Sequence, residues 1–366
     1  MSTTSKNQSR RPLKTAYFAL MSALLLASAP LVRSQPSLSS EKLSQLERRQ
    51  FASQVTSANT TAQAIAACDC GFIDLTEGAD MTQVWNSLFK ADFTTMSSKD
   101  LGNGFRFMRN AIKRENSAIS RAFNPENAGL CGSGLCLDVR PQEDTRVPSG
   151  GVYTKSKEMH FGNYYAEVKI PSTPGTVSAF YIYKTDVNEV DMEYNNPTGA
   201  INGSIKDTVK PQVYNGNIAD PSTYQKTYAP GGADMSLDFH TWGFHWTTDR
   251  VEFGLDGDYA QVISTNVPQL PGTLSFSHWS DGNPNYSGGP PVQDTMLNFR
   301  RTWAFWNDTS VTMACKRSTA PCKLDARILS GSSADAISSA HRVHQSIGAL
   351  PLLSLLVLSV TVLSLA

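Results

Sequence analysis

The chain has 366 residues, of which 40% are hydrophobic and 17% charged, and its formal net charge is zero. This length fits one large domain with flanking segments, because all-β domains often exceed two hundred residues. The balanced charge gives no electrostatic reason to expect a nucleic-acid partner.

The first part of the chain has the pattern of a targeting segment. Four basic residues precede an apolar run over residues 17–32, and the small residue Ser34 follows it. Such a pattern predicts a secretory signal peptide over residues 1–34. Residues 35–67 are rich in Ser, Thr, Gln and Ala, and we interpret them as a pro-segment or linker. The folded domain is expected over residues 68–325.

Six cysteines suit a secreted chain, in which disulfides are stable. A bridge within Cys68-Asp-Cys70 would close a strained ring, so each of these two cysteines should take an outside partner. The bridge that closes the shortest feasible loop joins Cys131 to Cys136. This leaves Cys315 and Cys322 as partners for Cys68 and Cys70. This pairing is a preference among fifteen connectivities. Zinc is the alternative use, but the spacings do not match common zinc sites, and we expect no metal and no cofactor.

Four sequons for N-linked glycans, at Asn59, Asn202, Asn285 and Asn307, predict surface positions in a secreted protein.

From Cys68 to about Trp306 the sequence consists of short alternating runs separated by turn residues, which is typical of an all-β protein. The runs expected as strands are residues 164–170, 178–183, 187–194, 241–246, 250–255 and 273–279. Asp256-Gly257 after the fifth run predicts a hairpin turn. We therefore expect an antiparallel β-sandwich with a concave substrate cleft.

One of these runs carries three acids at alternate positions, Glu189, Asp191 and Glu193, with Val190 and Met192 between them. On a strand the three carboxylates share one face. Like charges on neighbouring positions destabilise a strand, so a purely structural strand would avoid them. Enzymes that cleave glycosidic bonds use such a pair, with one carboxylate ionised and a second protonated near neutral pH. A bare triplet is weak evidence, because an exposed strand can carry solvated acids.

The surrounding segments strengthen this interpretation. The stretch from Ser178-Ala-Phe-Tyr-Ile-Tyr183 to Glu189-Val-Asp-Met-Glu193 resembles the catalytic segment of glycoside hydrolase family 16. Residues 161–169 and 239–257 are similar to two further segments of the family, in the same order. The opening Cys68-Asp-Cys-Gly71 is similar to the fungal wall-anchored branch. The resemblance covers about residues 68–310 and implies a concanavalin A-like jelly roll.

In that family the first acid is the nucleophile, so the resemblance implies that Glu189 forms a covalent glycosyl-enzyme. It assigns Glu193 as general acid and base. Asp191 between them would hydrogen-bond Glu189 and orient it. Retaining enzymes place their two carboxyl groups about 5–5.5 Å apart. The spacing has no extra residue, so we expect a regular strand and no β-bulge at the triplet.

The predicted sugar-binding residues are less specific. Tyr181 precedes the triplet, and Gln212-Val-Tyr214 and Ser277-His-Trp279 align with strands that line the family's cleft. Tyr214 and Trp279 would stack on sugar rings, and Gln212 and Ser277 would hydrogen-bond hydroxyls. The alternative for Trp279 is a place in the core. Trp303 is a further candidate, whereas Trp242 and Trp246 are expected in the core.

The same comparison reveals one departure from the family. Relatives often have an aromatic residue immediately before the first catalytic glutamate, and here that position is Asn188.

The end of the chain predicts a lipid anchor. Residues 347–366 are almost entirely apolar and follow a spacer rich in small residues over residues 326–346. This is the pattern of a GPI attachment region with a removed tail, and the alternative is a C-terminal transmembrane helix. A monomeric cell-surface protein anchored to the plasma membrane is expected.

Two activities remain open for such a protein. The first is a retaining hydrolase of wall β-glucan or a transglycosylase that joins β-glucan to chitin. The second is a carbohydrate-binding wall protein without catalysis on the same fold.

Overall fold

The computed structural model describes residues 68–113, 117–195, 203–313, 315–316, 319–325 and 337–338, all within the compact unit Glu47–Ala366. The predicted signal peptide, the segment 35–67, the C-terminal tail and most of the attachment region lie outside these residues, as do Asn59 and Asn202. Over the described ranges no helix combines the length and apolarity needed to cross a membrane.

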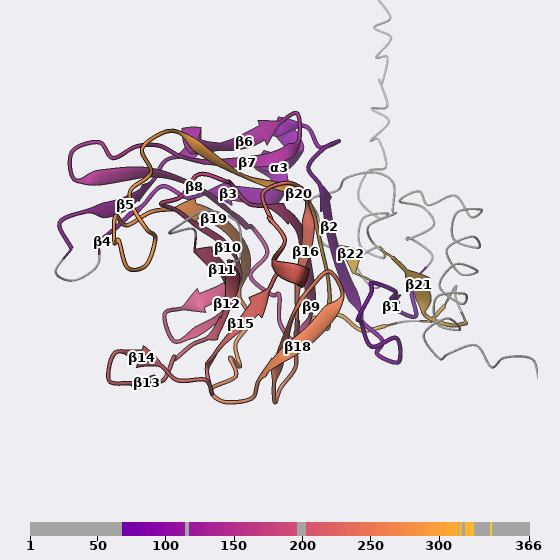
Figure 1. Cartoon of the computed structure of the whole chain (residues 1–366). Helices are drawn as coiled ribbons and strands as arrows, with labels where there is room; N and C mark the ends of the chain where they lie inside the picture. Colours follow the sequence, from indigo (N-terminus) through magenta and orange to yellow (C-terminus); the bar gives the residue numbers. More distant parts are fainter. Residues whose placement is uncertain are drawn as a thin grey trace, which may run out of the picture. The chain divides into compact units, whose positions relative to one another are not determined.

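Two large sheets make up the described domain (Figure 1). The first sheet has nine strands, in the spatial order β15 Tyr224–Tyr228, β12 Ser204–Val209, β11 Asn188–Asn195, β10 Val177–Thr185, β19 Thr273–Trp279, β8 Arg146–Thr154, β5 Ser120–Phe123 and β4 Ala111–Lys113, with β3 Phe105–Phe107 paired to β8.

The second sheet also has nine strands, in the order β18 Asp258–Ile263, β17 Val251–Leu255, β16 His240–Trp246, β9 Gly162–Lys169, β20 Thr295–Trp306, β2 Ser87–Asp92 and β22 Ile337–Ser338, with β7 Gly134–Val139 on β20 and β6 Ala128–Cys131 on β7.

Smaller elements complete the described chain. They are the strand pairs β1 Phe72–Asp74 with β21 Cys322–Leu324 and β13 Tyr214–Asn215 with β14 Ile218–Ala219, the helix α3 Ser98–Gly104, and the 3₁₀ turns η1 Pro125–Asn127 and η2 Pro230–Gly232. Neighbouring strands are antiparallel except in the pairs β5–β8 and β1–β21, among the strands described here. The predicted all-β antiparallel sandwich is confirmed, with these two parallel pairs as exceptions.

The main core lies between the two sheets and is rich in aromatic residues. Phe180 of the first sheet packs on Phe244 of the second, with ring centroids 5.5 Å apart. Phe276 and Phe299 make an edge-to-face contact across the same layer at 5.0 Å. Trp242 and Trp246 are buried there, as predicted. Such interlocking aromatic side chains fix the first sheet, and the acids on it, against the second.

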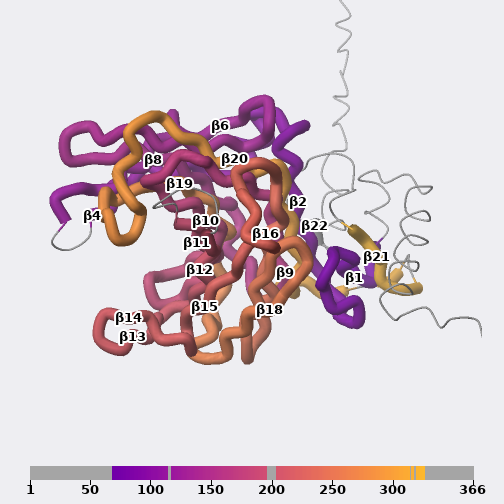
Figure 2. The backbone as a smooth tube through the Cα atoms, in the orientation of Figure 1, coloured from indigo at the N-terminus to yellow at the C-terminus, as the bar shows by residue number. Residues whose placement is uncertain are grey.

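A second apolar cluster covers the outer face of the second sheet. Phe72, Trp85 and Leu324 pack there against Tyr165 and Trp303. The cluster is closed by two disulfides, Cys68–Cys322 and Cys70–Cys315, and a third joins Cys131 to Cys136. The predicted pairing is confirmed. Figure 2 shows the consequence, because the indigo start and the yellow end of the described chain run beside each other at β1 and β21.

Each of the six predicted strands is present, with ends that differ by up to two residues. The predicted hairpin turn is also present, since Asp256 and Gly257 both have positive φ, 52° and 90°, between β17 and β18. The long strand β20 was not predicted. It is buried on both faces over much of its length, because the second cluster covers its outer side, and so it lacks the alternation of a half-exposed strand.

Candidate active site

The three predicted acids lie on β11, a central strand of the first sheet. Val190, Met192 and Tyr194 of this strand point into the core, so the alternate positions face outward. Pairing with β10 runs without interruption from Glu189 to Asn195, and the one register irregularity lies earlier, between Tyr183 and Thr185 on β10. The predicted regular strand at the triplet is confirmed.

Register with the neighbouring strands places polar residues in rows across the sheet. Asp191 is paired with Tyr181 on β10, Tyr181 with Ser275 on β19, and Ser275 with Tyr153 on β8. A second row starts at Glu189 and continues through Tyr183 to Thr273. These two parallel rows form the floor of the site.

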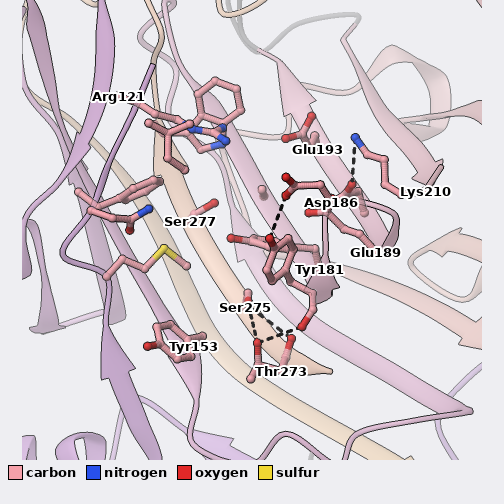
Figure 3. A pocket seen from close by; sticks show the side chains of 18 of the residues that line it. Arg121, Tyr153, Tyr181, Asp186, Glu189, Glu193, Lys210, Thr273, Ser275 and Ser277 are labelled. Atoms are coloured by element: carbon pink, nitrogen blue, oxygen red, sulfur yellow. Dashed lines mark hydrogen bonds and ion pairs between the residues drawn. The ribbon is translucent and has the colours of Figure 1, made fainter. Parts of the chain in front are cut away.

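A pocket of about 470 Å³ opens above this floor. Figure 3 shows Glu189, Glu193 and Lys210 along one side of it, with Ser275 and Ser277 across from them. Its lining residues come from six strands and from the segments that join them: Met108, Asn110, Ile112, Arg121, Phe123, Tyr153, Ala179, Tyr181, Tyr183, Asp186, Glu189, Asp191, Glu193, Lys210, Thr273, Ser275, Ser277, Trp279 and Tyr286.

The side chains of Glu189 and Asp191 are hydrogen-bonded to each other, and the pKa values of both are raised. Burial raises the pKa of Glu189 to about 7, although the charge of Lys210 and a hydrogen bond with Asp191 oppose the rise. Burial, and then the charge of Glu189, raise the pKa of Asp191 well above its usual range. The hydrogen bond between the two side chains lowers the pKa of Glu189, so Asp191 favours the ionised form of Glu189 and orients its carboxyl group.

Lys210 compensates the charge of this pair. Its Nζ lies 3.9 Å from Oδ2 of Asp191, and its backbone N–H donates to the carbonyl of Glu189 at 3.0 Å. Burial lowers the pKa of Lys210, but the charges of Asp191, Glu189 and Glu193 outweigh burial and raise it above its usual value. Lys210 therefore stays charged, and it favours the ionised form of the carboxylates beside it.

Glu193 has different neighbours. The hydroxyl of Tyr286 donates a hydrogen bond to its Oε2. The Tyr286 ring stacks on Trp279, with centroids 6.0 Å apart and planes 18° apart. Lys206, the cross-strand partner of Glu193 on β12, places its Nζ 4.4 Å from the Tyr286 ring centroid. Arg121 lies over Trp279 at 4.2 Å. The two glutamates thus lie in distinct environments, which is what two different chemical roles require.

Three of the predicted sugar-binding residues line the pocket: Tyr181, Ser277 and Trp279. The side chains of Tyr181 and Ser277 are hydrogen-bonded to each other, and burial raises the pKa of Tyr181, which therefore stays protonated. Trp279 is only 2% exposed and packs with Phe123, so it supports the wall of the pocket and offers little open surface.

The other three predicted residues lie outside the pocket lining. Trp303 is 0% exposed in the outer cluster, where its Nε1 donates to Thr76, so the structure corrects its assignment from the cleft to the core. Tyr214 is 55% exposed on β13 and donates its hydroxyl to Gln212. Both residues lie in the segment between β12 and β14, and neither lines the pocket.

The contacts of Asn188 explain why no aromatic residue is needed immediately before Glu189. Its Oδ1 accepts from the backbone N–H groups of Gln269 and Leu270, both at 3.1 Å, and its Nδ2 donates to the carbonyl of Leu270. It shares the face of Val190, away from the acids. This position therefore fixes a loop and adds nothing to the pocket.

Lys210, Tyr286 and Arg121 were missed by sequence reasoning. Lys210 directly follows β12, the strand after the triplet, and a turn-rich stretch of Asn, Gly and Ser surrounds Tyr286. Arg121 lies on β5, far from the triplet in sequence. No local pattern marked them, because only strand order brings them together. Across the described residues, no group of three or more His, Cys, Asp or Glu side chains is arranged to hold a metal ion.

A two-sheet sandwich with a carboxylate-lined cleft is the class that this fold and site define. Residues 126–301 match the family model for glycosyl hydrolases family 16. The predicted resemblance to that family is confirmed.

Individual relatives agree with this family. A beta-glucanase of Acetivibrio thermocellus is 29% identical over 232 residues, which cover 59% of this chain and 62% of the relative. Crh-like protein 5 of Aspergillus fumigatus is 30% identical over 165 residues, 42% of this chain and 39% of the relative. The match thus spans less than two thirds of either relative's length. The catalytic domain of a Thermotoga petrophila laminarinase has the same fold, with a TM-score of 0.50 at 19% identity over 60% of this chain and 97% of that domain.

Proposed function

We propose that the protein is a retaining β-glycosidase of cell-wall β-glucan. Glu189 attacks the anomeric carbon as its bond to the leaving oxygen breaks, and Glu193 gives its proton to that oxygen. In the second step the acceptor hydroxyl attacks the anomeric carbon and the bond to Glu189 breaks. Glu193 takes the proton of that hydroxyl. The observation that carries this proposal is the placement of Glu189, Asp191 and Glu193 on one face of β11, where all three line the pocket and the two glutamates have different neighbours.

Asp191 and Lys210 support the nucleophile without reacting. Asp191 donates to Glu189 and fixes the direction of its carboxylate. Lys210 offsets the negative charge on this side of the pocket. Tyr181 and Ser277, on the floor and opposite wall, are the proposed contacts to sugar hydroxyls.

Covalent trapping tests the nucleophile. A 2-deoxy-2-fluoro glucoside with a good leaving group should add one sugar to the protein, and peptide mass analysis should locate it on Glu189. Glu189→Gln should neither react nor turn over glucan. Glu158→Gln, an exposed acid outside the pocket, is the matched control and should behave as wild type. Full activity in Glu189→Gln would reject the proposal.

Transglycosylation is the second candidate, and the similarity to Crh-like protein 5 favours testing it. It needs the same intermediate and differs in the acceptor. Incubation with a β-glucan donor and a labelled chitin oligosaccharide should give labelled polymer if a sugar is the acceptor. Only shortened glucan should form if water is the acceptor.

The proposed location is the cell surface, through secretion and a GPI anchor, as the two terminal patterns of the sequence predict. Release of the protein from intact cells by a phosphatidylinositol-specific phospholipase tests the anchor. Retention after this treatment would favour the transmembrane alternative.

A further inference from the structure

We propose that Tyr286 is the positioning residue of the acid/base, holding the transferable proton of Glu193 on Oε1. The inference rests on the proposed function, because it concerns how Glu193 performs the role given to it there. It starts from one contact, the hydrogen bond from the Tyr286 hydroxyl to Oε2 of Glu193.

The ring of Tyr286 is held firmly enough to direct its hydroxyl. It stacks on Trp279, and Lys206 lies over the ring at 4.4 Å. Trp279 is in turn held by Arg121 and packs with Phe123. Because a cation near an aromatic face and an offset stack are both attractive, rotation of this ring away from Glu193 is unfavourable.

The backbone of Tyr286 is tied to the same strand that carries Glu193. Its carbonyl accepts from Nδ2 of Asn195, the last residue of β11, at 2.9 Å. Its N–H donates to the carbonyl of Asn283 at 3.1 Å. Ser287, the next residue, donates to Asp281 at 3.1 Å. The loop therefore keeps a fixed register with β11, and the hydroxyl of Tyr286 keeps a fixed distance from the carboxyl group.

This contact decides which oxygen of Glu193 carries the proton. A protonated carboxyl group has one O–H donor. Since Oε2 accepts from Tyr286, the proton of Glu193 resides on Oε1. As the glycosidic C–O bond breaks, its electron pair goes to the leaving oxygen, and that oxygen takes the proton from Oε1. The charge left on Glu193 then meets a hydrogen bond already in place at Oε2, which favours the transition state. In the second step Oε1 accepts the proton of the acceptor hydroxyl.

Tyr286→Phe tests the inference, since it removes only the hydroxyl and keeps the ring. On unmodified β-glucan oligosaccharides, kcat should fall about tenfold to a hundredfold. On a dinitrophenyl glycoside, whose leaving group needs no proton, the single-turnover release of dinitrophenolate should stay within about twofold of wild type. Equal losses on both substrates, or no loss on either, would overturn the proposal.

Two further variants separate positioning from a general structural effect. In a Glu193→Gln background, Tyr286→Phe should add no further loss, because the two residues act as one unit. Additive losses would contradict it. Tyr183→Phe removes another pocket hydroxyl, which donates to Asp186, and should affect both substrates alike. Thermal unfolding midpoints equal to that of wild type should show that each variant is folded.

The outcome also distinguishes the two proposals. If wild type releases no dinitrophenolate and forms no covalent sugar adduct, the proposed function itself fails. If wild type does both but Tyr286→Phe shows no dependence on the leaving group, only the role of Tyr286 fails.

Discussion

The ammonium group of Lys210 lies 3.9 Å from the carboxyl group of Asp191. Lys210 directly follows β12, the neighbour of the strand that bears all three acids. The same lysine hydrogen-bonds the backbone of Glu189. The positive charge of Lys210 lowers the pKa of both Glu189 and Asp191, so removing this charge should change the pH dependence of activity.

Lys210→Met should weaken activity most at low pH. Lys210 lowers the pKa of Glu189, so its loss raises that pKa above about 7 and protonates the nucleophile over a wider range. The acidic limb of kcat/KM against pH should move up by about one unit, with about tenfold lower activity at pH 6. The exposed Lys157→Met is the control. An unmoved limb would show that Lys210 does not act on Glu189.

Two substitutions of Asp191 should differ in their effect on the acidic limb of kcat/KM. Asp191→Asn keeps a neutral donor toward Glu189, so the acidic limb should stay near its wild-type position. Asp191→Ala removes the donor, and because that hydrogen bond lowers the pKa of Glu189, the limb should move to higher pH. Measured kcat/KM profiles from pH 4 to 9 decide the matter. Identical profiles for both variants would contradict a donor role.

Asp207 should make stability fall as pH rises. It is fully buried on β12 of the first sheet, Thr227 donates to its Oδ2, and burial raises its pKa from 3.8 to about 7. The folded state therefore holds the proton more tightly than the unfolded state, so its contribution to stability declines between about pH 4 and pH 7. The full shift corresponds to about 4 kcal/mol.

Replacing this carboxyl group tests the effect. Asp207→Asn should flatten the fall in urea-unfolding free energy between pH 4 and pH 7 and should make the protein more stable than wild type at pH 8. Asp258→Asn, on an exposed strand position, should leave the pH dependence unchanged. A wild-type curve that stays flat from pH 4 to 7 would contradict the prediction.

The long-range and local disulfides should differ in their effect on stability. Cys68–Cys322 closes a loop of 254 residues, whereas Cys131–Cys136 spans five. Cys70–Cys315 closes nearly the same loop, so the two long-range disulfides are removed together with four alanines. Their joint loss should cost about 2–5 kcal/mol of unfolding free energy, because the unfolded chain gains most freedom from a long loop. Removing Cys131–Cys136 with two alanines should cost less. Thermal unfolding of both variants gives the comparison, and a larger loss for Cys131–Cys136 would reverse this expectation.

Sequence reasoning succeeded where a pattern repeats along one strand. The alternation of Glu189, Asp191 and Glu193 with apolar residues predicted both the strand and the shared face, because the period of a strand is two. The hairpin at Asp256-Gly257 was readable for a similar reason, since few residue pairs accept two positive φ angles.

It was incomplete where a residue's environment comes from a distant segment. Trp303 lies on a strand whose outer face is covered by the two ends of the domain, and no alternation in its own strand reveals that cover. Tyr286 contacts Glu193 across 93 positions of sequence. Its place depends on strand order and on loop hydrogen bonds, neither of which a local motif records.

The rows across the first sheet place polar side chains at regular intervals along the cleft. Asp191, Tyr181, Ser275 and Tyr153 are successive cross-strand partners, so their spacing is the interstrand distance of about 4.8 Å. A polymer lying along this row meets a new polar side chain at each such step, independently of the length and sequence of the loops. Subsite preferences in this scaffold are therefore best altered by exchanging single outward-facing strand residues. Insertions in the connecting turns leave the spacing of the polar side chains unchanged.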